Sequence, residues 1–250
     1  MTNARAGELA AALTALRTRV DAAAAAAGRS PSDIELLPVT KFFPASDVIE
    51  LHRLGCSAFG ESREQEASNK AEVVTAELGG ELSGVAIRWH MIGRVQRNKA
   101  RALAGWAYAV HAVDKTALVG ALDRAAGQAL EDGRRTEPLL VYIQVSLDGD
   151  PDRGGVDIAS PGAVDELCAA ADSAESLRFV GLMAIPPLGA DAAECFGRLA
   201  RERDRVQTTY PQRLGLSAGM SGDLEAAIEH GSTCVRVGTA LMGQRPLTSP

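Results

Sequence analysis

Lys41 is the residue whose position most suggests covalent chemistry. It ends an apolar run, residues 34–40, and two aromatic residues and Pro44 follow it. A short apolar run bounded by turn residues predicts a buried strand, and proline suits the first turn of a helix. Parallel α/β proteins place their chemistry at such strand ends. Lys41 is therefore either an exposed surface lysine or an amine that apolar neighbours activate for Schiff-base formation.

Two turns near the end of the chain have the composition of phosphate-binding loops. Each combines small residues, hydroxyl groups and bare backbone N–H groups just before an expected helix. Such turns bind phosphate through N–H donors and the helix dipole, although ordinary helix caps have the same composition. Two such turns after the last two strands favour a phosphate site. The candidate residues are Ser217, Gly219, Met220, Ser221, Gly238 and Thr239.

Several other residues stand at the ends of expected strands. Arg236 interrupts an apolar strand and is costly there unless it meets an anion or an acceptor, which favours an inward, functional position. His90 follows Trp89 and is either an acid/base group or a core histidine. Met183 ends a further strand, and Glu61 is either paired with a cation or an ordinary acid at a helix start.

Strand and helix patterns alternate about eight times along the chain. We expect strands over residues 34–40, 56–60, 86–92, 108–113, 138–145, 177–184, 213–217 and 234–237. We expect helices over residues 8–27, 46–54, 63–78, 115–131, 161–173, 190–208 and 223–230, a basic helix start within 94–101 and a last short helix after 240, with Asp114 and Asp223 as helix caps.

This alternation predicts a single-domain (β/α)₈ TIM barrel with an additional N-terminal helix. The barrel would span residues 1–245, with a frayed tail over 246–250. An open doubly wound sheet is the alternative, but evenly spaced units favour closure. In a barrel, the loops after the strands meet at one mouth, which would bring Lys41, His90, Met183 and the glycine-rich turns together.

Composition narrows the classes of function. The 250 residues carry a net charge of −6 with a pI of about 5.3, which argues against general binding to nucleic acid or to an anionic membrane. The four cysteines are scattered without metal-ligand spacing, so no metal is expected, and they suit a reducing cytoplasm. The chain has no signal-like segment. Four basic residues are therefore expected to form a solvated helix face rather than a nucleic-acid site: Arg94, Arg97, Lys99 and Arg101.

A Schiff-base lysine opposite a phosphate cradle suits two kinds of ligand. One is a sugar phosphate, as in a lysine-dependent aldolase. The other is pyridoxal 5′-phosphate (PLP), which carries an aldehyde and a phosphate in one molecule.

Motifs along nearly the whole chain resemble those of the YggS/PROSC family of PLP homeostasis proteins. They are Val39-Thr40-Lys41, Phe59-Gly60-Glu61, Trp89-His90-Met91-Ile92-Gly93, Gln96-Arg97-Asn98-Lys99, Gly181-Leu182-Met183-Ala184-Ile185-Pro186, Leu216-Ser217-Ala218-Gly219-Met220-Ser221 and Val235-Arg236-Val237-Gly238-Thr239-Ala240. The set as a whole is highly specific, whereas each motif alone is not.

The resemblance implies a barrel of the alanine racemase type with PLP held on Lys41 as a Schiff base. It implies a phosphate cradle made of Ser217, Ser221, Gly238 and Thr239, with backbone N–H groups from Gly219 to Ser221 and around Gly238, and it places Arg236 near the pyridine nitrogen. The resemblance further implies a PLP carrier or a regulator of vitamin B6 and amino-acid pools, and the scattered cysteines and the N-terminal sequence lead us to expect it in the cytoplasm. PLP-requiring apo-enzymes are the expected partners, and a monomer is the expected state.

The chain departs from the family's usual motifs at two positions. Thr40 stands where the family usually has serine, and Ser62 stands where it usually has asparagine.

An arginine at the pyridine nitrogen does not yield its proton, so the ring is a poor electron sink. We also expect no equivalent of the additional β-domain that supplies a second acid/base residue, a tyrosine, in racemases of this fold. We therefore expect little or no turnover, with a slow amino-acid racemase as the alternative.

Overall fold

The strands form one parallel sheet that curls into a ring. The computed structural model describes residues 3–79 and 87–245. Its strands are β1 (Glu35–Pro38), β2 (Ala58–Glu61), β3 (Arg88–Met91), β4 (Ala107–Val113), β5 (Leu139–Ser146), β6 (Val156–Asp157), β7 (Leu177–Met183), β8 (Gly215–Ser217) and β9 (Cys234–Val237). Their order is β1-β9-β8-β7-β5-β4-β3-β2, and the two-residue β6 pairs with β5 beside this path.

The two ends of the sheet meet just beyond β1 and β2. A parallel bridge joins Val39 to Gly60, and the Thr40 N–H donates to the Gly60 carbonyl at 3.0 Å. The ring is therefore a TIM-type barrel, as the alternating pattern predicted, and the open doubly wound alternative is wrong. Lys41 follows this closing bridge directly.

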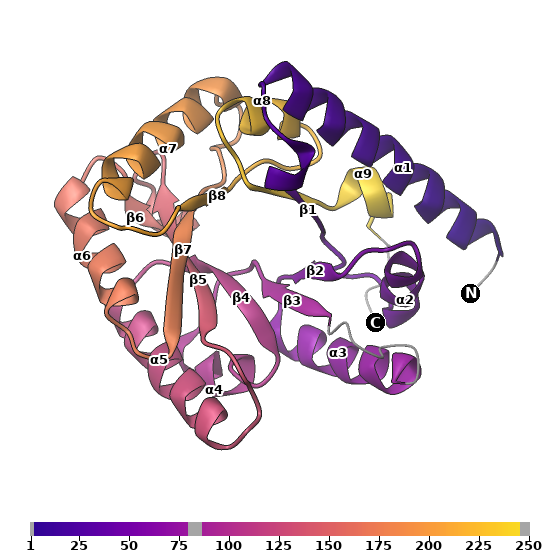
Figure 1. The fold of residues 1–250 in the computed structure, drawn as a ribbon, viewed down its shortest axis with the longest axis horizontal. Coiled ribbons are helices and arrows are strands. Elements are labelled where there is room, and N and C mark those ends of the chain that lie inside the picture. The colour runs from indigo at the N-terminus through magenta and orange to yellow at the C-terminus, as the bar shows by residue number, and fades with distance from the viewer. Residues whose placement is uncertain (1–2, 80–86, 246–250) are drawn as a thin grey trace.

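Helices cover the outside of the ring (Figure 1). The α-helices are α1 (Asn3–Ala26), α2 (Ala45–Arg53), α3 (Glu64–Leu78), α4 (Ala100–Leu103), α5 (Thr116–Glu131), α6 (Pro161–Asp172), α7 (Ala192–Gln207), α8 (Leu224–Glu229) and α9 (Thr239–Met242). Three 3₁₀ turns are η1 (Pro31–Asp33), η2 (Arg97–Lys99) and η3 (Pro151–Arg153). In the described part of the chain, no helix is both long and apolar enough to span a bilayer.

The additional helix predicted at the N-terminus is α1. Its apolar residues recur at helical spacing, and Leu9, Leu13 and Leu16 are almost fully buried. They pack against α2, α8 and α9, which Figure 1 shows beside α1. Gly28 adopts φ +64°, a left-handed conformation that favours glycine and terminates the helix.

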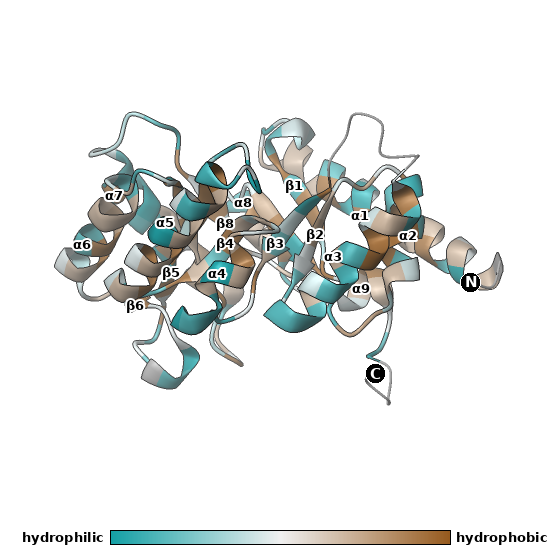
Figure 2. Cartoon of the chain, turned by 90° about the horizontal axis from the view of Figure 1, so that it is seen from below, coloured by the Kyte–Doolittle hydropathy of each residue, from teal (hydrophilic) through white to brown (hydrophobic). Residues whose placement is uncertain are grey.

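The apolar core lies mainly between the strands and the outer helices. On β5, Val141 and Ile143 are fully buried in this layer. The alternate residues Tyr142 and Gln144 point into the ring, because successive strand residues face opposite sides. In Figure 2 several helices carry both hydrophilic and hydrophobic colours, as expected when one face packs on the sheet.

The structure corrects several local predictions. The side chain of Asp114 does not cap α5, because its Oδ2 accepts from the Gly155 N–H at 3.3 Å. The basic stretch over 94–101 contains the 3₁₀ turn η2 and only the start of the short α4. The strand β6 and the 3₁₀ turns were not predicted. The start of the third predicted strand, at residue 86, and the predicted tail lie outside the described residues.

Candidate functional site at the barrel mouth

A cavity of about 540 Å³ lies at the carboxyl ends of the strands. Six residues proposed from the sequence line it: Lys41, Met220, Ser221, Arg236, Gly238 and Thr239. They come from segments after β1, β8 and β9 and from β9 itself. The closed ring brings these distant segments together, so one volume faces the amine, the glycine-rich turns and a guanidinium.

Lys41 is half-buried in the turn that follows β1. Its Nζ lies 5.8 Å from the centre of the Phe42 ring. Thr40, on one side, is fully buried, whereas Phe42, on the other, adopts φ +70°. A positive φ is uncommon for a bulky residue and needs support from its surroundings. The amine therefore projects from a turn with a special backbone conformation.

The two glycine-rich turns lie beside each other at the mouth. The Ser221 hydroxyl accepts from the Ala240 N–H at 3.1 Å, which links the turn after β8 to the start of α9. Within the described residues, the N–H groups of Ser221 and Thr239 have no acceptor. Ser221 and Thr239 line the mouth cavity, so these free donors and the Ser221 hydroxyl are suited to bind an anionic group there.

Gly219 is required by its surroundings. Its φ is +92°, and a Cβ there would lie 2.6 Å from the Ala227 Cβ. Its carbonyl accepts from the Arg236 N–H at 2.9 Å. Asp223 stands before α8 as predicted, but its Oδ1 accepts from the Met220 N–H at 2.5 Å rather than from the first turn of the helix. The Met220 N–H is thus already bonded.

Arg236 points into the ring, as predicted from the cost of burying it unpaired. It is 5% exposed; its Nη1 donates to Ser217 Oγ at 2.6 Å and its Nη2 to the Ala184 carbonyl at 3.0 Å. Burial lowers the pKa of Arg236, but a guanidinium keeps its proton in proteins. A fixed positive charge therefore stands at the floor of the cavity.

Below Arg236, hydrogen bonds continue through the ring. His111 Nδ1 lies 2.7 Å from Ser217 Oγ, and His111 Nε2 lies 2.9 Å from His90 Nδ1. Arg236 can only donate, so Ser217 Oγ accepts from it. One hydroxyl thus links the buried guanidinium to His111 and, through it, to His90.

Both histidines are neutral. Burial, followed by the charge on Arg88, lowers the pKa of His90 to about 3. Burial, followed by His90 and Arg236, holds the pKa of His111 well below its usual value. His90 is therefore a core histidine rather than a proton-transfer group near neutral pH.

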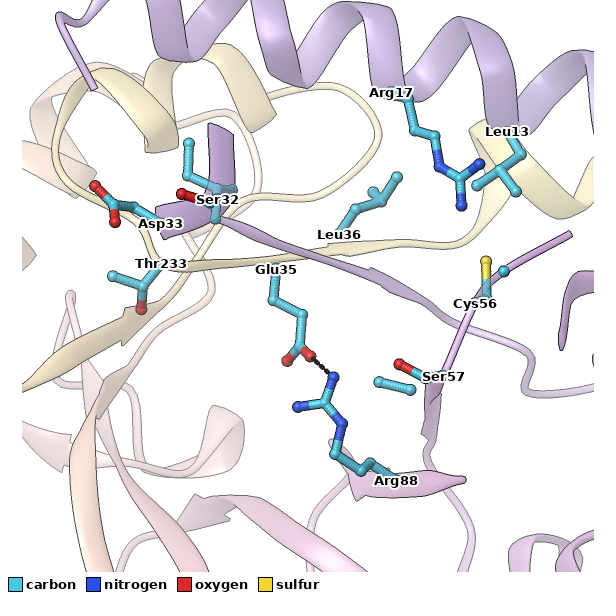
Figure 3. Close-up of a pocket in the computed structure, with 13 residues that line it drawn as sticks. Leu13, Arg17, Ser32, Asp33, Glu35, Leu36, Cys56, Ser57, Arg88 and Thr233 are labelled. Atoms are coloured by element: carbon cyan, nitrogen blue, oxygen red, sulfur yellow. Dashed lines mark hydrogen bonds and ion pairs between the residues drawn. The ribbon is translucent and has the colours of Figure 1, made fainter. Parts of the chain in front are cut away.

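The series of hydrogen bonds that runs from Arg236 to His90 ends near the amino-terminal end of the barrel. His90 Nε2 has no hydrogen-bond partner among the described residues and lies 3.9 Å from Glu35 Oε2. Glu35 pairs with Arg88 at 2.6 Å across a second cavity, of about 560 Å³ (Figure 3). This cavity lacks both Lys41 and the glycine-rich turns, so we place the candidate site at the mouth.

Not all the predicted site residues line the mouth cavity. Ser217, His90 and Met183 are buried beneath it, and Gly219 shapes the turn above. Sequence reasoning missed His111, Gln144 and Arg153. Gln144 stands two residues after Tyr142 on the same strand, so both side chains face the inside of the barrel. This alternation could have revealed Gln144. Arg153 ends the 3₁₀ turn η3 and donates to the carbonyls of Ile185 and Pro186, which no pattern indicated.

Residues 12–246 match the model of the family described as alanine racemase, N-terminal domain. The pyridoxal phosphate homeostasis protein of Mycobacterium tuberculosis is 59% identical over 251 residues, which cover 98% of this chain and 96% of that protein. The chain belongs to the pyridoxal phosphate homeostasis protein family. The pyridoxal phosphate homeostasis protein of Escherichia coli is 37% identical over 239 residues, which cover 93% of this chain and 95% of that protein.

Solved structures agree with this family assignment. PipY of Synechococcus elongatus, solved with PLP bound, matches with a TM-score of 0.75 and 33% identity, covering 94% of this chain and 100% of that one. An alanine racemase from E. faecalis matches with a TM-score of 0.61 and 16% identity, covering 94% of this chain and 61% of that one. The second likeness concerns the fold alone. The pyridoxal phosphate homeostasis family therefore shares its barrel with alanine racemases.

Proposed function

We propose that this chain binds PLP at the barrel mouth, with Lys41 as the Schiff-base lysine, and acts in PLP homeostasis. The observation that carries the proposal is the convergence on one cavity of an amine, a buried guanidinium and two glycine-rich turns. PLP supplies an aldehyde that condenses with an amine and a phosphate that needs donors. The relatives' names favour PLP over a sugar phosphate.

The residues present fit this cofactor. A volume of about 540 Å³ lies within the usual range for small-molecule sites. The unbonded N–H groups of Ser221 and Thr239, together with the Ser221 hydroxyl, suit the phosphate. Arg236 suits a ring nitrogen that stays unprotonated, because its guanidinium can only donate. Ser217 then serves this site by holding Arg236.

The lining of the cavity supports a protein with little or no turnover. Among the described residues that line it, the ionisable ones are Lys41, Arg94, Arg153 and Arg236. Arginine does not exchange its proton near neutral pH, so Lys41 has no second acid/base partner there. Racemisation needs proton transfer on two faces of the substrate. A slow PLP-dependent racemase, with water as the second group, is the alternative.

We extend the proposal to the cellular setting: a cytoplasmic monomer that exchanges PLP with PLP-requiring apo-enzymes. The half-exposed turn of Lys41 and the open mouth support exchange, because the cofactor would enter and leave without movement of a domain.

The test compares PLP binding by the wild type, Lys41→Ala and Lys115→Ala, since Lys115 is an exposed lysine that does not line the mouth cavity. Visible absorbance after gel filtration should persist in the wild type and Lys115→Ala and disappear in Lys41→Ala. A wild type that stays colourless with excess PLP would overturn the proposal. Alanine racemisation at the rate of a dedicated enzyme would reject the proposal of little or no turnover.

A further inference from the structure

The backbone on both sides of Lys41 is held by a single helix. On one side, the Thr40 carbonyl accepts from Lys70 Nζ at 2.9 Å. On the other, the Phe42 N–H donates to Glu66 Oε1 at 2.7 Å. Glu66 and Lys70 are one turn apart on α3, so they share one face of that helix. The helix thus contacts the peptide groups that flank the amine-bearing residue.

These contacts form a connected group of charges. Lys70 Nζ lies 2.6 Å from Glu61 Oε1 and 3.4 Å from Glu66 Oε1. Glu61 is fully buried and also accepts from the Thr40 hydroxyl at 2.7 Å. Lys70 and Glu61 are both buried, so separating them would leave buried charge without compensation, and this pair holds Lys70 in place. Glu61, predicted as either a paired or an ordinary acid, is the paired one.

The turn needs such support because of its conformation. Phe42 adopts φ +70°, a conformation that costs energy for a residue with a Cβ. Without an acceptor for its N–H, Phe42 would relax towards negative φ, which would rotate the neighbouring peptide and re-aim Lys41. A small change of aim matters, since bond formation depends on the alignment of amine and aldehyde.

We propose that Glu66 and Lys70 are positioning residues that hold the Lys41 turn in the conformation that presents its amine to the cavity. The inference rests on the proposed role of Lys41. It adds that capture of the aldehyde depends on α3, a helix that provides no lining residue of the mouth cavity within the described chain. The phosphate grip lies in the turns after β8 and β9, which flank β1 on the side away from β2 and α3, and it would be independent of this group.

The experiment uses Glu66→Ala and Glu66→Gln, with Glu72→Ala on the exposed face of α3 as control. Glutamine keeps an oxygen for the Phe42 N–H, whereas alanine removes it. Lys70→Met is the less suitable variant, because it strips Glu61 of its cation and threatens folding. The first readout is amide hydrogen exchange of Phe42 in the protein without cofactor.

The second readout is the ratio of affinities for PLP and pyridoxamine 5′-phosphate. Both ligands offer a ring and a phosphate, but the second has no aldehyde and forms no Schiff base. Glu66→Ala should speed Phe42 exchange and lower the PLP preference, each by about tenfold or more, the worth of one charge-assisted hydrogen bond. Glu66→Gln should retain most of the exchange protection of Phe42 and most of the preference for PLP, and Glu72→Ala should match the wild type.

Unchanged Phe42 exchange and an unchanged affinity ratio in Glu66→Ala would overturn the inference. So would an equal loss of both affinities, because it would indicate general damage to the site. A wild type without any preference for PLP would instead refute the Schiff-base role of Lys41. In that case the exchange readout alone still decides whether Glu66 holds the turn.

Discussion

The hydroxyl of Ser217 accepts a hydrogen bond of 2.6 Å from Arg236 inside the ring of strands. It also lies 2.7 Å from His111 Nδ1, so it separates a fixed positive charge from a neutral imidazole. This relationship makes the interior of the barrel, below the proposed cofactor, a polar and ordered region rather than an apolar core. The first three predictions concern Ser217, Arg236 and the two buried histidines.

Ser217→Ala should lower the free energy of unfolding by about 1–3 kcal/mol, because Arg236 loses an acceptor and His111 loses a hydrogen-bond partner in a buried site. Urea unfolding measures this loss. Ser160→Ala is the control, since Ser160 is exposed and its side chain does not cap α6. Equal stability of the two variants would show that the Ser217 contacts contribute nothing.

Arg236→Gln should shift the visible absorbance of the PLP-loaded protein, because removing the guanidinium changes the charge beside the pyridine ring. The matched control is Arg178→Gln, which alters an exposed arginine on β7. If the spectrum of Arg236→Gln is that of the wild type, Arg236 does not touch the ring.

Stability should fall as the pH drops below about 6.5, the usual pKa of histidine. His90 has a pKa of about 3 in the folded state, and that of His111 is also strongly lowered. Between the unfolded and folded values, the unfolded chain binds protons that the native chain excludes, so stability is retained above pH 6.5 and lost below it. Each histidine should contribute up to about 1.4 kcal/mol per pH unit.

Urea unfolding of the wild type and His90→Asn between pH 7.5 and 5 measures this slope. The variant should be less stable at every pH, but its stability should depend less steeply on pH. A variant with the same slope as the wild type would show that His90 does not exclude a proton in the folded state.

The turn after β8 offers a matched pair of glycines. Gly219→Ala should destabilise the fold by about 1–3 kcal/mol and weaken PLP binding, since the new Cβ meets Ala227 and the left-handed φ is unfavourable. Gly222→Ala should be nearly neutral in stability, because no atom lies within 4 Å of its added Cβ. Thermal unfolding and PLP titration distinguish them; equal effects would contradict the assigned role of Gly219.

The sequence predicted the barrel because the apolar runs and the glycine stops recur at regular intervals. It also predicted that Lys41 and the glycine-rich turns meet, because every parallel strand points its carboxyl end to the same mouth. Arg236 could be assigned inward on energetic grounds alone. These features follow from local patterns that the fold preserves.

Other features depend on pairs that no local pattern specifies. His111 lies within an apolar strand, and its role appears only when the ring places it between Ser217 and His90. The support of Lys41 by Glu66 and Lys70 depends on where α3 crosses the turn. Asp114 has the type of a helix cap but bonds to a loop that the sequence could not place beside it.

The identity of the Schiff-base lysine is the claim on which the account depends most. Borohydride reduction of the PLP-loaded protein, followed by peptide mass mapping, tests it directly, because reduction makes the linkage permanent. We predict one phosphopyridoxyl group, on the peptide that contains Lys41. An adduct on Lys70, Lys99 or Lys115 in place of Lys41, or no adduct on a protein that retains PLP, would contradict it.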